Sequence, residues 1–139
     1  MDRSSIKAAL KTLIDGAFPD ARIEGFDGAP VKPDRIDADG LVQLESEGSG
    51  EEQVDLNPVT YNKTALFEIV IAAPDAAGCA AMASALGLAI VSDRQLGGAC
   101  EWLDANAGET DDLTEDGMTG HFEARVTVSA EYSTTNPLD

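Results

Sequence analysis

Apolar and polar side chains alternate without a break near the end of the chain. Such alternation, with a period of two, is typical of an antiparallel strand that buries one face. We therefore expect a strand over residues 122–132, followed by a short tail over 133–139. The apolar positions of this strand are Phe122, Ala124, Val126, Val128, Ala130 and Tyr132.

A second alternating segment spans residues 60–72, although Lys63, Leu66 and Val70 break its pattern. It still predicts a strand with one mainly apolar face. That face would carry Tyr61, Ala65, Phe67, Ile69 and Ile71. Shorter apolar-rich stretches predict further strands at 22–26, 41–45 and 99–103.

Two segments have the features of helices. Residues 5–15 carry apolar side chains at spacings of three, four and seven, the stripe of an amphipathic helix that Gly16 would end. The members of that stripe are Ile6, Leu10, Leu13 and Ile14. The Ala-rich segment 76–91 has high helix propensity, and Asp75 is suited to cap its first turn. Its small side chains would allow close packing against a sheet.

Glycine, proline and clustered charges predict flexible loops at 27–40, 46–57 and 104–118. We expect one domain over residues 1–139, because its length suits a single core. The order of the elements predicts an α/β (α+β) fold: a mostly antiparallel or mixed sheet of four to five strands with two main helices packed on it.

The balance of 9 basic against 26 acidic residues gives a net charge of −17. Such a surface repels phosphates, which argues against tight nucleic-acid binding. An apolar run long enough for a membrane span and a signal peptide are both missing from the sequence, so we expect a soluble protein made in the cytoplasm. Cys79 and Cys100 lack the CxxC spacing, which favours buried free thiols.

The sequence offers little for catalysis. Its one histidine, His121, stands on the polar side of the final strand, where we expect it to be exposed. Phosphate-binding glycine motifs are missing, and the many carboxylates give no reason to choose a catalytic pair. We expect a protein that is not an enzyme and has no cofactor.

One segment has part of a calcium-loop pattern. Asp104, Asn106 and Glu115 occupy positions 1, 3 and 12 of the twelve-residue pattern. However, Glu109 stands where the sharp turn requires glycine, and Asp111 stands where an apolar residue is usual. Two interpretations stay open: a weak calcium site, or a solvated hairpin loop, which the departures favour.

A succession of features over residues 58–137 suggests a family. The strand at 64–72 ends in Ala-Pro, an Ala-rich helix runs to Asp93, a turn holds Leu96-Gly97-Gly98, and the strand 125–132 ends in Tyr-Ser-Thr-Thr-Asn-Pro. In this order the features resemble the tail terminator family (minor tail protein U-like) of siphophages and gene transfer agents.

The resemblance implies a structural virion protein of the tail or neck, assembled in the host cytoplasm. Six copies would form a ring on the head-proximal end of the tail tube, stop its growth and provide the attachment surface for the head-tail connector. Its partners would be the tube protein, the connector and further copies of itself. DNA would pass through without specific binding, and no membrane is involved. The alternatives are another neck or tail-completion protein, or a small calcium- or ligand-binding module.

Six subunits of charge −17 would repel one another in a ring unless the acidic residues avoid the subunit contacts. An acidic channel would also let DNA slide past. We therefore expect acidic residues from at least one of the segments 45–55 and 104–116 to face the channel or its rim. The alternative is that these segments keep the outer surface soluble. The residues concerned are Glu47, Glu51, Glu52, Asp111, Asp112 and Glu115.

Overall fold

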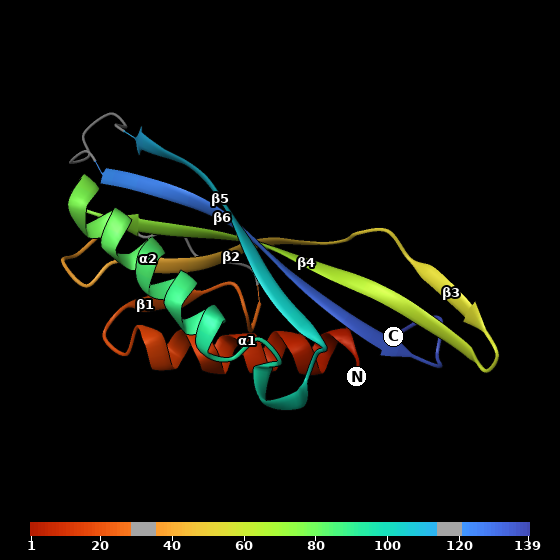
Figure 1. The fold of residues 1–139 in the computed structure, drawn as a ribbon. Coiled ribbons are helices and arrows are strands. Elements are labelled where there is room, and N and C mark those ends of the chain that lie inside the picture. Colours follow the sequence, from red (N-terminus) through yellow and green to blue (C-terminus); the bar gives the residue numbers. More distant parts are fainter. Residues whose placement is uncertain (29–35, 114–120) are drawn as a thin grey trace.

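The computed structural model describes residues 1–28, 36–113 and 121–139. Within these ranges, two helices, a short 3₁₀ helix and six strands form an α+β fold, as the sequence predicts (Figure 1). In chain order they are α1 (Arg3–Ala17), β1 (Arg22–Glu24), β2 (Leu41–Ser49), β3 (Gln53–Leu56), β4 (Val59–Ala73), α2 (Ala76–Ser92), η1 (Leu96–Gly98), β5 (Trp102–Leu113) and β6 (His121–Thr134).

The sheet is mixed, with strand order β1-β2-β4-β6-β5, and β3 pairs with β4. Only the β1–β2 pair is parallel among the described pairs. β4 pairs with β6 along nearly its whole length, from Tyr61 opposite Thr134 to Ala73 opposite Phe122. The other side of β4 pairs first with β3 and then with β2. The far end of the β3–β4 hairpin therefore projects beyond the helices (Figure 1).

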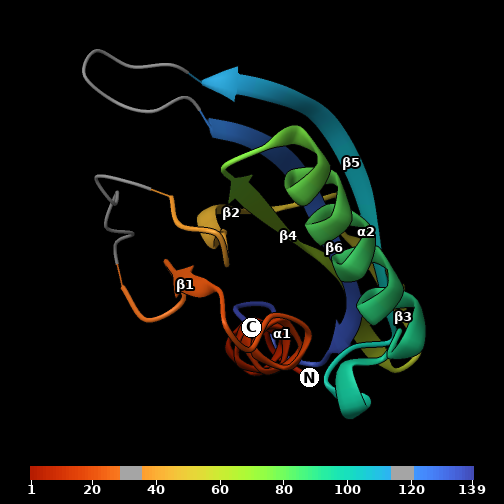
Figure 2. The ribbon, with the colours of Figure 1, turned by 90° about the vertical axis from the view of Figure 1, so that its left-hand side faces the viewer.

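Both helices pack on one face of the sheet, which curves around them (Figure 2). Alternate side chains of β4 and β6 meet the helices there, as the period of two predicts. The buried members from the strands include Ala65, Phe67, Ile69, Ile71, Ala124, Val126, Val128, Ala130 and Tyr132. The helices contribute Ile6, Leu10, Ile14, Cys79, Leu86 and Ile90 to the same core.

The predicted cap at Asp75 is confirmed, whereas α1 begins at Arg3, two residues before its predicted start, and buries Ile6, Leu10 and Ile14 of its stripe but Leu13 only partly. The side chain of Asp2 accepts a hydrogen bond from the N–H of Ser5 at 2.7 Å, and Asp75 accepts one from the N–H of Gly78 at 2.5 Å. Each carboxylate satisfies a backbone donor that the first helical turn leaves free. Both helices are slightly longer than predicted: α1 extends two residues beyond the predicted segment 5–15 at each end, and α2 extends one residue beyond 76–91.

Two of the predicted loops are wrong in large part. Residues 46–49 continue β2 and 53–56 form β3, while residues 104–113 lie in β5, so the sheet has six strands rather than four to five. β5 contributes the fully buried Leu103 and the partly buried Ala105 to the core, whereas Ala107 is already exposed, so its apolar pattern is weak. Pairing with β6 supplies the order that its own sequence does not indicate.

The segments around these loops need smaller corrections. The strand predicted at 99–103 begins only at Trp102, after the η1 turn. Residues 36–40 lie outside helices and strands, as predicted for 27–40, whereas 29–35 and 114–120 fall outside the described residues. The tail after β6 is held in place: Lys63 Nζ donates to the carbonyl oxygens of Pro137 and Asp139 at 2.5 and 2.9 Å.

A matched pair of glycine substitutions would test this packing. Gly25 has a φ of +90°, and a Cβ added there would lie 2.2 Å from the carbonyl oxygen of Leu44, so Gly25→Ala should lower the free energy of unfolding by ~1–3 kcal/mol. Gly16 lies in α1 with nothing within 4 Å of an added Cβ, so Gly16→Ala should raise it by up to about 1 kcal/mol. Urea unfolding measures both, and equal effects would contradict the described backbone.

Candidate functional site

The projecting β3–β4 hairpin ends in exposed apolar side chains. Val54 and Val59 are each 47% exposed and Leu56 is 80% exposed. All four residues of β3 are exposed, and the connecting Asn57-Pro58 carries no charge. We call Val54, Leu56 and Val59 the hairpin tip. Single exposed apolar side chains are common on protein surfaces, but three together on one projection favour contact with another molecule.

A second apolar surface lies on α2. This 17-residue helix contains no charged residue, although the chain carries −17 overall. Its buried side contributes to the core, and its opposite side is exposed, with Leu88 at 69% and Val91 at 60%. We call that side the α2 outer face: Ala76, Ala77, Ala80, Ala81, Ser84, Leu88 and Val91. Soluble surface helices normally place polar residues there.

A hollow of about 650 Å³ opens between α1 and the end of α2. Small and apolar side chains line most of it, including Ala9, Leu13, Ala17, Ala89 and Leu96. The one carboxylate in its wall, Asp93, accepts a hydrogen bond from the N–H of Gly97 at 3.0 Å. Two of the residues that line the hollow, Gly16 and Gly97, have no side chain and therefore take up none of its space. The hollow can therefore accept an apolar group from outside.

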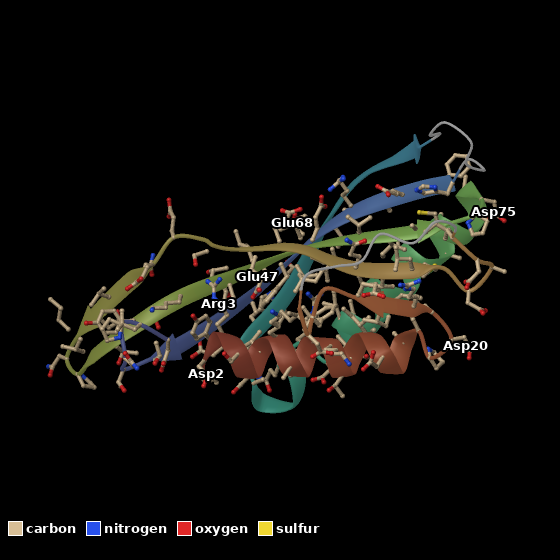
Figure 3. All side chains as sticks on the ribbon, turned by 180° about the vertical axis from the view of Figure 1, so that it is seen from behind. Asp2, Arg3, Asp20, Glu47, Glu68 and Asp75 are labelled. Atoms are coloured by element: carbon tan, nitrogen blue, oxygen red, sulfur yellow. The ribbon has the colours of Figure 1, made fainter. Side chains whose placement is uncertain are left out.

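The face of the sheet turned away from the helices is polar. Thr127 donates to Glu68 at 3.0 Å, and Arg125 contacts Glu45 across the sheet. Figure 3 shows Glu68 on the side of the sheet opposite α1, whereas Glu47 lies near Arg3 on the α1 side. The strands alternate polar outward and apolar inward, as expected when helices cover one face only.

His121 is an exception on that polar face. Its exposure is 7%, so the prediction of a surface histidine is wrong. At this end of the sheet it shares a small hollow with Ile36, Leu41 and Val70, whose side chains shield it from water. Its Nε2 lies 3.4 Å from the Glu123 carboxylate. Among the described residues that line this hollow there is no Ser, Thr or Cys, and a His–carboxylate pair alone does not make a hydrolytic site.

The two cysteines are free and buried, as predicted. Burial is the largest cause that raises the pKa of both thiols, to about 11 for Cys100. Thiolate is the reactive form of cysteine, so neither side chain is suited to nucleophilic chemistry near neutral pH.

The structure separates the acidic residues that were expected to face a channel. Glu47 pairs with Lys7 at 3.0 Å, and Glu51 and Glu52 lie exposed at the β2–β3 connection. Asp111 and Asp112 belong to the far end of β5, opposite Glu123 and Phe122. Glu51 and Glu52 lie about ten residues along the sheet from Asp111 and Asp112, roughly 33 Å at ~3.3 Å per residue. Glu115 falls outside the described residues.

The residues of the calcium pattern are placed on a strand. Asp104 and Asn106 stand opposite Ser129 and Thr127 in the β5–β6 ladder, and Glu115 lies outside the described residues. Asp104 pairs with Arg94 at 2.9 Å. The N–H of Ala105 and then the Arg94 guanidinium hold the pKa of the Asp104 carboxyl below its ordinary value. Among the described residues, no cluster of three or more metal-binding side chains occurs.

No protein-family model matches this chain, and no curated protein matches it either. Within the described part of the chain, neither helix is long and apolar enough to cross a membrane.

Sequence reasoning missed the hairpin tip, although a signal was present. Val54 and Leu56 alternate with polar residues, Asn57-Pro58 marks a turn, and Val59 begins the next alternation. Two alternating runs around a two-residue turn are the pattern of a hairpin. The neighbouring glycines and glutamates drew attention to flexibility instead.

We predict that calcium changes the stability of this protein little, because Arg94 already neutralises Asp104 and the ladder extends the backbone there. A site with a Kd of ~10 µM would add ~2.7 kcal/mol at 1 mM calcium, which would raise Tm by roughly 8 °C for a chain of this length. Thermal unfolding with calcium, and with magnesium as the control, should show less than ~2 °C. A saturable rise that Asp104→Ala abolishes would contradict this prediction.

Proposed function

We propose that this protein is a tail terminator: a structural virion protein that closes the tail tube as a six-membered ring and presents a surface to the head-tail connector. The proposal takes its function and its number of subunits from the resemblance of the C-terminal half. The elements on which that resemblance depends are β4, the Ala-rich α2, the η1 turn and β6.

The observation that carries the proposal is the presence of two different apolar surfaces on one very acidic subunit. A closed ring is built from head-to-tail contacts, in which one surface of a subunit meets a different surface of the next. The hairpin tip and the helix side of the molecule, with its α2 outer face and hollow, are two such surfaces, and they lie apart (Figure 1). A symmetric dimer would need only one self-complementary surface.

The charge distribution also supports assembly. Repulsion between subunits of −17 is screened beyond about 8 Å at physiological salt, so a contact surface must be free of charge over at least that distance. α2 provides roughly 25 Å of uncharged helix at ~1.5 Å per residue. The surface that is free of like charge is thus also the apolar one.

Ring formation is the first test of this function. Purified protein added to growing tail tubes should halt their elongation, and electron microscopy of the tube ends should show a cap with sixfold symmetry, because the cap must match the rotational symmetry of the tube. A protein of unrelated fold and equal charge is the control. A cap of different symmetry would contradict the proposal, and binding to the head alone would favour another neck or tail-completion protein.

The same function predicts that the channel repels DNA. Acidic residues at one rim, either Glu51 and Glu52 or Asp111 and Asp112, would face the passage, because the two groups lie too far apart to share one rim. The free protein should then show no tight binding to duplex DNA at ~0.15 M salt, since phosphate binding requires basic contacts. Fluorescence anisotropy with labelled duplex measures this. Tight binding, or a ring with a basic lumen, would refute an acidic channel.

A further inference from the structure

The hairpin tip and the hollow between the helices match one another in shape and chemistry. The tip is a narrow projection whose outermost large side chain, Leu56, is 80% exposed. The hollow is a concave apolar space of about 650 Å³. The tip points away from the helices in the same chain, so it cannot fill its own hollow (Figure 1).

We propose that the hairpin tip of one copy docks into the hollow between α1 and α2 of the next copy, with the α2 outer face alongside it. This contact rests on the proposed function, because it assigns the two halves of the ring interface. An apolar projection that enters a pocket elsewhere on the same kind of molecule makes a head-to-tail contact, which closes into a ring or continues as a filament.

Charge limits where a second copy can make contact. Another subunit brings −17 with it, and most of the surface would repel it. The last residues of the tip, Leu56-Asn57-Pro58-Val59, are uncharged, and α2 is uncharged along its full length. The nearest carboxylates on the two sides, Asp55 and Asp93, each accept a hydrogen bond within their own chain. An uncharged projection therefore meets a mainly apolar hollow, whose one carboxylate, Asp93, is hydrogen-bonded within its own chain.

The tip is also held ready for docking. Asn62 Nδ2 donates to Asp55 at 2.8 Å, and Ser133 Oγ donates to Asn62 at 2.7 Å. These bonds tie β3 to β4 and β4 to β6 close to the tip. A rigid projection loses little conformational entropy on docking, which strengthens a contact of given area.

Two surface substitutions separate the halves of this contact. Leu56→Asp places a charge on the tip, and Thr12→Glu places one at the edge of the hollow, where Thr12 is exposed and α1 tolerates glutamate. Each should weaken self-association at least ~tenfold, as loss of a central apolar contact does. Leu138→Asp is the matched control, because Leu138 is 91% exposed but lies outside both surfaces.

Mixing the two variants gives the decisive measurement. The Thr12→Glu chain keeps its tip and the Leu56→Asp chain keeps its hollow, so one contact per pair survives. The mixture is sedimented at about 1 mM total protein, because a contact with a millimolar Kd is well populated at that concentration. It should contain species up to twice the 14.5 kDa monomer mass and none larger. Wild-type protein should form larger species. A mixture that gains nothing over the separate variants would overturn the docking.

Cysteine cross-linking provides a second measurement, which also traps a transient contact. Leu56→Cys and Thr12→Cys chains, mixed under mild oxidation, should form a disulfide-linked heterodimer, whereas Leu138→Cys with Thr12→Cys should not. The native thiols are buried and should contribute little background. Wild-type protein that stays monomeric at about 1 mM, together with no such cross-link, would also overturn the docking.

The docking and the terminator function can fail separately. If both charged variants cap tail tubes as well as the wild type does, the docking is wrong and the function stands. If the mixing experiment succeeds but the wild type leaves tube growth unchanged, the docking stands and the function is wrong.

Discussion

The pairing of β4 with β6 is the interaction on which the rest of the structure depends. It runs for thirteen consecutive residue pairs, from Tyr61 opposite Thr134 to Ala73 opposite Phe122. One end of this pair lies beneath the helices and supplies most of the strand side chains of the core. The other end extends past them and supports β3 at the tip. A single long ladder thus provides both the folded core and the projection that carries the hairpin tip.

Stability and assembly place opposite demands on the composition of this chain. A net charge of −17 keeps separate subunits apart in solution, while a ring requires them to touch. The conflict is reduced by position: carboxylates occur in loops, in strands and in α1, whereas α2 carries none. One side of α2 packs in the core, and its other side is an exposed surface without charge, which does not repel another acidic subunit.

The strongly periodic elements were predictable from the sequence, and the weakly periodic ones were not. The stripe of α1, the cap at Asp75 and the alternation of β6 each come from local rules that the structure confirms. Most of β5 could not be identified, because past Leu103 its sequence is mainly polar and its order comes from pairing with β6. His121 was misplaced for a similar reason, since Ile36 and Leu41 from other segments cover it.

The assembly surfaces were hidden from sequence reasoning by the same rule that found the core. The period of apolar residues predicts which of them face the core. In the Ala-rich segment 76–91 this period is weak, so the sequence does not show that Leu88 and Val91 lie on the exposed side of the helix. The exposed side becomes evident only when Cys79, Leu86 and Ile90 are seen to take the core positions. The remaining apolar residues of α2 then have no use within the chain. An uncharged face on an otherwise acidic molecule is explained when another copy covers it, because burial there removes apolar surface from water without bringing like charges together.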